Sequence, residues 1–209
     1  MKLAFALLYC IQWLPLRLIH ALARAVGWLA FYAVRPRRRV GLINLRHCYP
    51  EWTEQKRRAL LKQHFVHMAM LVLEYGLYWY GSAQRLKNMV HYQDKHHLDD
   101  ALARGDKVIL LYPHFTAFEA AVYALNQEMF LISMYSRQKN QAMDAQILKG
   151  RYRYNNVFLI GRTEGLRSII KKLKASTAPF VYLPDQDFGR KESVFVDFFG
   201  IPTATSCRL

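Results

Sequence analysis

From residue 107 onward, short apolar runs alternate with longer stretches in which apolar residues recur at helical spacing. The apolar runs predict strands at 107–112, 129–135, 157–160, 179–183 and 193–199. The stretches between the first four runs predict helices at 116–127, 141–154 and 163–174. Strands that alternate with helices of this length are typical of a parallel sheet with helices on both faces. The sequence therefore predicts an α/β fold with a mostly parallel sheet covered by helices.

A long helical pattern precedes this region. Residues 54–80 carry apolar side chains at helical spacing, from Leu60 to Trp79. Thr53 stands just before the pattern and is a suitable N-cap, because its hydroxyl can accept a hydrogen bond from a free backbone N–H of the first turn. We expect one long helix here.

The amino-terminal residues 3–34 are mostly apolar and predict a membrane-associated helix. On such a helix Arg17, His20 and Arg24 would lie on one stripe. The longest stretch without charge, residues 3–16, is shorter than the roughly 20 residues of a comfortable membrane span.

Three interpretations of this segment compete. A cleaved signal peptide is disfavoured by Arg17 inside the apolar run and by the arginines at 35–39. A tilted single span with its carboxyl side in the cytoplasm fits the positive-inside rule, and a helix lying in the membrane interface fits the arginine stripe. Both of these make residues 1–34 a membrane anchor and leave 35–209 as the second unit of the chain.

The chain is strongly basic, with a net charge of +15. Residues 35–62 hold nine Lys or Arg against two Glu, and residues 149–174 hold eight against one. Such segments attract nucleic acid, an anionic membrane surface, or an acidic protein or substrate, unless they form a merely solvated face. Nucleic-acid binding would explain the charge but neither the apolar segment nor the polar residues at strand ends. The three cysteines are far apart and lack CxxC spacing, which predicts no disulfide framework and no zinc site.

Charged or titratable residues follow three of the predicted strands. His114 follows the first strand, Arg162 the third and Asp185 the fourth. In an open α/β sheet, ligands bind beyond the carboxyl ends of the strands. We therefore predict a functional site at this edge. For Asp185 the alternative is a structural turn residue in Pro-Asp-Gln-Asp.

His114 and Glu119 form an H-x₄-E pattern. Residues five positions apart point about 140° away from each other on a regular helix, so they meet only if His114 lies in the turn before the helix. The carboxylate would then accept a hydrogen bond from one ring nitrogen and raise the basicity of the other. The bare pattern is common by chance, but its place after a buried strand makes it a candidate general base with its orienting partner.

Residues 113–119, together with 181–192 and the Phe-Val-Asp-Phe-Phe-Gly block at 195–200, resemble the bacterial lipid A late acyltransferases (the lauroyl and myristoyl transferases) of the lysophospholipid acyltransferase superfamily. The basic region 35–49 is similar to the same family. The resemblance covers essentially the whole chain, and the later block is more specific than the H-x₄-E pattern.

This resemblance implies transfer of a fatty acyl group from acyl carrier protein to a hydroxyl of a Kdo-bearing lipid A precursor, at the cytoplasmic face of the bacterial inner membrane. It implies an anionic glycolipid acceptor and a membrane as partners, with no nucleic acid, no metal and no cofactor beyond the acyl carrier protein co-substrate. His114 would take the proton of the acceptor hydroxyl and Glu119 would orient His114. Arg151 or Arg162 would stabilise the oxyanion, and Asp185 would orient these arginines or close a helix end.

Members of that family are usually longer than this chain, so the resemblance also leads us to expect a missing carboxyl-terminal part in the acyltransferase domain at 35–209. Two alternatives stay open. The chain is another membrane glycerolipid or glycolipid acyltransferase, or it is an inactive truncated member of the family.

Overall fold

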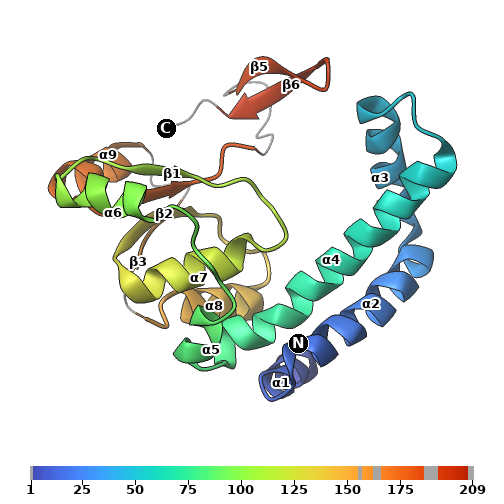
Figure 1. Ribbon diagram of the computed structural model, residues 1–209, viewed down its shortest axis with the longest axis horizontal. Helices are drawn as coiled ribbons and strands as arrows, with labels where there is room; N and C mark the ends of the chain where they lie inside the picture. The colour runs from blue at the N-terminus through green and yellow to red at the C-terminus, as the bar shows by residue number, and fades with distance from the viewer. Residues whose placement is uncertain (1, 155–156, 162–165, 186–192, 207–209) are drawn as a thin grey trace.

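The computed structural model describes residues 2–154, 157–161, 166–185 and 193–206 (Figure 1). Its amino-terminal part is helical and consists of α1 (Lys2–Ile11), α2 (Leu16–Ala33), α3 (Arg35–Cys48) and α4 (Glu54–Tyr80). The predicted single helix over 3–34 is therefore two helices, because the chain turns between α1 and α2 and Pro15 precedes the first residue of α2. Within the described ranges, every helix falls short of the length and apolarity that crossing a bilayer requires.

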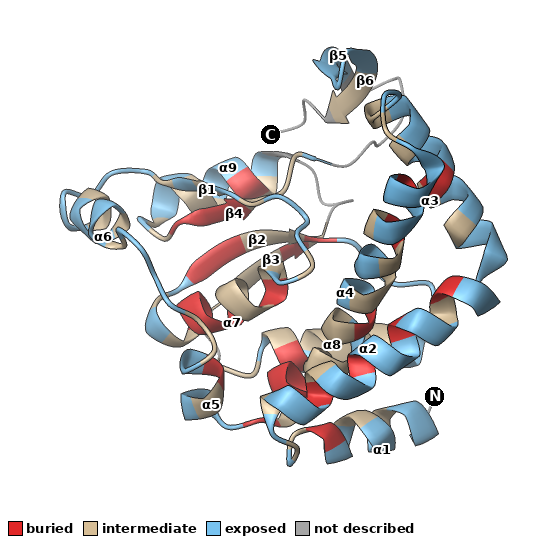
Figure 2. Cartoon of the chain, turned by 45° about the vertical axis from the view of Figure 1, so that its right-hand side comes forward, coloured by how far each residue is buried: buried red, intermediate tan, exposed pale blue. Residues whose placement is uncertain are grey.

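The long helix α4 is confirmed, and α2 lies along it in both views (Figures 1 and 2). Thr53 is its N-cap, and the hydroxyl accepts from the backbone N–H of Lys56 at 3.3 Å. One stripe of α2 is buried, formed by every fourth residue: Ile19, Ala23, Gly27 and Phe31. At Gly27 an added Cβ would lie 2.4 Å from the Cα of Val66, so only glycine allows the two backbones to approach this closely.

Two short helices, α5 (Ala83–Lys87) and α6 (His96–Ala103), connect α4 to a four-stranded sheet. The strands are β1 (Ile109–Leu111), β2 (Leu131–Tyr135), β3 (Val157–Gly161) and β4 (Phe180–Tyr182). Their order across the sheet is β1-β4-β2-β3, and every pair is parallel, which confirms the predicted α/β fold. The last of these four strands in the sequence thus lies between the first two.

The three helices that connect these strands lie on both faces of the sheet (Figure 2). They are α7 (Phe118–Glu128), α8 (Gln141–Arg151) and α9 (Leu166–Ala175). Right-handed crossovers place α7 and α8 on one face and α9 on the other, because the chain reverses its direction across the sheet after β3. On the α9 side Ile169 packs against Ile132 and Phe180, and on the α7 side Leu125 packs against Val181.

The predicted strand at 193–199 forms, but outside the parallel sheet. It is β5 (Ser193–Phe198), and it pairs in antiparallel fashion with β6 (Ile201–Ser206), a strand that the sequence patterns did not predict. Phe199 and Gly200 form the turn, with φ of 55° and 70°. These positive angles at both turn residues match the twist of a two-residue hairpin.

Candidate active site

The candidate site lies at the carboxyl ends of the neighbouring strands β1 and β4. Leu111 is in register with Tyr182, and the backbone N–H of Tyr112 still donates to the carbonyl of Tyr182 at 2.9 Å. His114 and Asp185 each follow their paired strand residue by three positions. Each also follows a proline, which lacks the N–H that would extend the ladder and holds the preceding residue extended. Equal spacing from a shared register therefore brings the two side chains together.

One carboxylate makes two contacts with the histidine. Asp185 Oδ1 lies 2.6 Å from His114 Nδ1, and Asp185 Oδ2 accepts from the backbone N–H of His114 at 2.6 Å. Burial opposes the negative charge, but the hydrogen bonds from His114 outweigh it and hold the pKa of Asp185 below its ordinary value. At neutral pH Asp185 is therefore ionised and can accept hydrogen bonds but not donate them. Nδ1 of His114 is thus the ring nitrogen that carries the proton in this contact.

The remaining ring nitrogen, Nε2, is then the basic one in neutral His114. The side chain of His114 is 32% exposed, so a substrate can reach it. The ring of Phe118 packs edge-on against the imidazole at 5.6 Å between centroids, and the Phe115 side chain beside it is 71% exposed. A basic nitrogen beside exposed apolar groups can serve a substrate that carries both a hydroxyl and a hydrocarbon chain.

Glu119 lies elsewhere. It is in the first turn of α7, is only 3% exposed, and accepts from Arg151 Nη2 at 2.9 Å and from the Tyr75 hydroxyl at 3.2 Å. Glu119 therefore pairs with Arg151 and Tyr75 and does not form the predicted hydrogen bond with His114. The physical reason is the partly buried guanidinium of Arg151 in α8, which offers the Glu119 carboxylate a stronger partner than an imidazole in a surface turn.

The Glu119 contacts join three helices, since Tyr75 comes from α4 and Arg151 from the end of α8. Burial disfavours the cation of Arg151, but Glu119 outweighs it and raises the pKa of Arg151. Burial also raises the pKa of Tyr75, with a further contribution from Glu119, so its hydroxyl stays a proton donor. The guanidinium carbon of Arg151 lies 5.4 Å from the ring centre of Tyr135, the last residue of β2.

The structure thus separates the predicted site residues into two groups. His114 and Asp185 meet, whereas Arg151 pairs with Glu119, which corrects for Arg151 the prediction that Asp185 orients it. Arg162 lies outside the described residues. Sequence reasoning missed Tyr75, because its helical spacing in α4 made it an ordinary packing residue.

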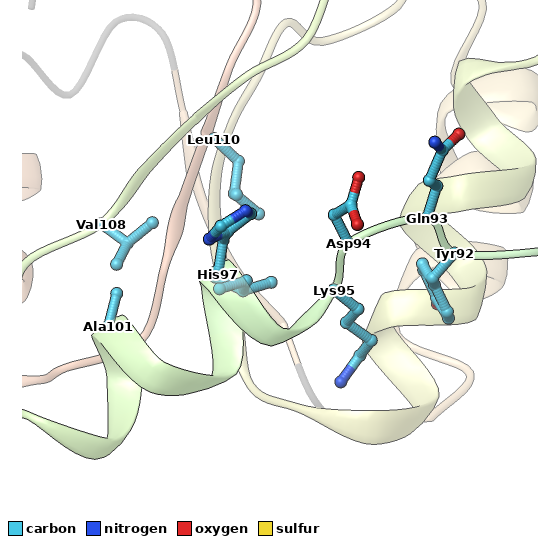
Figure 3. A pocket seen from close by; sticks show the side chains of 9 residues that line it. Tyr92, Gln93, Asp94, Lys95, His97, Ala101, Val108 and Leu110 are labelled. Carbon is cyan, nitrogen blue, oxygen red and sulfur yellow. The ribbon is translucent and has the colours of Figure 1, made fainter.

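A hollow of about 390 Å³ lies between α6 and β1, but it is not at this site (Figure 3). Its lining includes Tyr92, Leu98 and Leu110, and none of the predicted site residues. Its Lys95 is already paired with Asp99 and Glu128. Across the described part of the chain, His, Cys, Asp and Glu side chains form no group that could hold a metal ion.

Comparison with known proteins finds relatives of one kind. A lipid A biosynthesis acyltransferase of Haemophilus influenzae is 32% identical over 200 residues, which are 95% of this chain and 62% of the relative. A lipid A biosynthesis lauroyltransferase of Escherichia coli is 28% identical over 98% of this chain and 66% of its own length. A myristoyltransferase of the same pathway and organism is 29% identical over 80% of this chain and 52% of its own. The chain thus spans about three fifths of the length of the curated relatives it matches.

The match extends along nearly the whole sequence. The profile of the bacterial lipid A biosynthesis acyltransferases covers residues 2–208, which include both the H-x₄-E segment and the Pro-Asp segment that supply the histidine and its carboxylate partner. The chain belongs to the bacterial lipid A biosynthesis acyltransferase family.

Proposed function

We propose that this protein transfers a fatty acyl group from acyl carrier protein to a hydroxyl of a Kdo-bearing lipid A precursor. Membership of the family supports an acyl transfer to a lipid A-type acceptor. The observation that carries the mechanism is the pair of His114 and Asp185, 2.6 Å apart at the carboxyl ends of adjacent parallel strands. It leaves a basic and accessible Nε2 where an α/β sheet binds its ligands.

In the proposed reaction, Nε2 of His114 takes the proton of the acceptor hydroxyl while the oxygen attacks the thioester carbonyl. The new C–O bond gives a tetrahedral oxyanion. Its collapse breaks the C–S bond, and the thiolate of the carrier takes the proton back from the imidazolium. The reaction needs no covalent enzyme intermediate. Cationic donors stabilise the oxyanion, and Arg151 and Arg162 are the proposed candidates for this role.

Substitution of His114 by alanine tests the mechanism. Loss of a general base typically lowers kcat by about 10²–10⁴-fold. His67, which is exposed on α4, provides the control, because its substitution by alanine should leave transfer unchanged. The assay follows labelled acyl groups from acyl carrier protein to a purified Kdo-bearing precursor, with a lysophospholipid as a second acceptor.

Three outcomes of this assay bear on the proposal. A variant His114→Ala that keeps more than about a tenth of the wild-type kcat would rule out the imidazole as the base. Transfer to the lysophospholipid alone would favour a glycerolipid acyltransferase. Absence of transfer to either acceptor by the wild-type chain would support an inactive member of the family.

The proposed location is the cytoplasmic face of the bacterial inner membrane, with α1 and α2 as the attachment site. The face of α2 away from α4 exposes large apolar side chains, including Leu18, Leu22 and Leu29, and Arg17 and Arg24 are exposed beside this stripe. An exposed apolar stripe beside arginines suits the interface of an anionic bilayer. This proposal keeps the anchor at residues 1–34 and favours an interfacial helix.

Binding to lipid vesicles tests this attachment. The double variant Leu22→Glu/Leu29→Glu should lose sedimentation with phosphatidylglycerol vesicles and keep its circular dichroism, because both side chains already face solvent. The double variant Ala103→Glu/Ala142→Glu adds two glutamates at exposed positions of α6 and α8 and provides a charge-matched control away from α2. Equal sedimentation of wild type and double variant would contradict attachment through α2.

A further inference from the structure

Helix α9 presents a row of cations to solvent. Arg167, Lys171 and Lys174 are all exposed. They stand at positions i, i+4 and i+7, so they share one side of the helix over about 10 Å. Ile170 lies within the row and is 41% exposed. Among the residues that the structure describes, every ion pair is formed by other side chains, so the three cations of this α9 row have no carboxylate partner there.

The opposite side of α9 is already used by the core. Ile169 is buried, and both it and Leu173 belong to the apolar cluster that packs on β2 and β4. Lys172 is half-buried, and its Nζ lies 4.3 Å from the centre of the Phe158 ring. A helix that binds in a membrane interface needs its apolar face for the acyl chains, but the sheet occupies this face of α9. The exposed row can therefore attract a partner mainly through its charge.

The α9 row starts at the edge of the sheet that carries His114. Helix α9 connects the carboxyl end of β3 to the amino end of the parallel sheet's last strand, β4, so it runs antiparallel to both. Arg167 therefore lies toward the edge of the candidate site and Lys174 toward the opposite edge. In both views α9 and α2 lie on opposite sides of the molecule (Figures 1 and 2). The row is thus available to a second anionic partner while α2 lies on a bilayer.

We propose that the α9 row is the docking surface for an acidic protein, the acyl carrier protein that donates the acyl group. This inference rests on the proposed function for the identity of the partner. A partner helix with carboxylates at three- or four-residue spacing can face all three cations at once, and Ile170 supplies an apolar centre within a charged rim. Complementary charges steer the encounter and fix its orientation. Docking here places the carrier beside the edge of the sheet where Nε2 of His114 is accessible.

Reversal of the charges in the row tests this docking surface. Purified acyl carrier protein with a fluorophore at its amino terminus is titrated with the full chain, and fluorescence anisotropy gives the Kd. The variant Arg167→Glu/Lys171→Glu/Lys174→Glu should raise the Kd by about tenfold or more, because three weak attractions become repulsions. Replacement of the same three residues by glutamine should raise the Kd less and should also weaken its dependence on salt.

The variant Arg58→Glu/Lys87→Glu/Lys149→Glu is the matched control. It makes the same change in net charge at exposed positions of α4, α5 and α8, and its Kd should stay within about twofold of the wild-type value. Circular dichroism confirms that each variant is folded. The α9 charge-reversal variant should still sediment with phosphatidylglycerol vesicles, because the proposed membrane attachment lies on α2.

A Kd of the α9 charge-reversal variant equal to that of the control variant would overturn the inference, and so would a wild-type chain that does not bind the carrier. Loss of vesicle sedimentation with unchanged carrier binding would also overturn it and would make the row a membrane contact. Acyl transfer by wild type, combined with an unchanged Kd in the α9 variant, would refute the docking surface alone. Binding through the α9 row without any acyl transfer would refute the proposed function alone, so the two failures are distinguishable.

Discussion

Truncation of Glu119 to alanine is expected to destabilise the fold by about 3 kcal/mol. Its side chain is 3% exposed and accepts from Arg151 at 2.9 Å and from Tyr75 at 3.2 Å. Removal of one member of a buried ion pair typically costs about 3–5 kcal/mol, because the other charge stays buried without a partner. Arg151 keeps 24% of its side chain exposed, so water offsets part of this cost, while the unpaired Tyr75 hydroxyl adds about 1 kcal/mol.

Urea titration followed by circular dichroism measures this cost as the change in midpoint at constant slope. Asp99→Asn is the control, since it breaks a surface pair with Lys95 whose typical worth is about 0.5 kcal/mol. The double variant Glu119→Leu/Arg151→Met removes both charges and should recover most of the loss, because a packed apolar pair is often as stable as a buried ion pair. A Glu119→Ala midpoint no lower than that of Asp99→Asn would refute the reasoning.

Three further predictions test other parts of the structure. Gly27→Ala should lower the free energy of unfolding by about 1–3 kcal/mol in the same titration, because the new Cβ would lie 2.4 Å from the backbone of Val66. An unchanged midpoint would contradict the close approach of α2 and α4. The lowered pKa of Asp185 stabilises the native state at neutral pH. The wild-type protein should therefore be more stable than Asp185→Asn above the ordinary pKa of 3.8, and this difference should disappear as the pH falls through the lowered pKa. A difference in stability that grows on acidification would contradict this prediction. Salt should raise the apparent KM for the proposed anionic acceptor, because the exposed arginines of α3 would attract it over a screening distance that shrinks to about 3 Å at 1 M salt. A KM independent of salt would exclude such attraction.

The sequence located His114 and Asp185 at the ends of strands but could not show that they meet. Apolar runs and helical spacing are local signals, and they predicted the parallel sheet and its helices correctly. The order of strands depends on which edges pair in three dimensions, and the insertion of β4 between β1 and β2 has no local signature. That insertion alone makes Asp185 the neighbour of His114.

The partner of Glu119 was missed for a related reason. Its position five residues after His114 suggested a local contact, whereas the actual partners lie on α4 and α8 and are brought near only by helix packing. The hairpin strand β6 was missed because Pro202 and the threonines around it lack an apolar run. Local patterns thus predicted the places of His114, Glu119 and Asp185 in the fold better than the residues they contact.

The position of β4 has a consequence for the order of folding. Asp185 follows His114 by 71 residues, and β4 is the last strand of the parallel sheet to leave the ribosome. Until it does, β1 and β2 lack the strand that lies between them in the sheet. Closure of such a distant contact is slow and exposes strand edges in the meantime. A nascent chain can therefore form the contact between Asp185 and His114 only after β4 has joined the sheet.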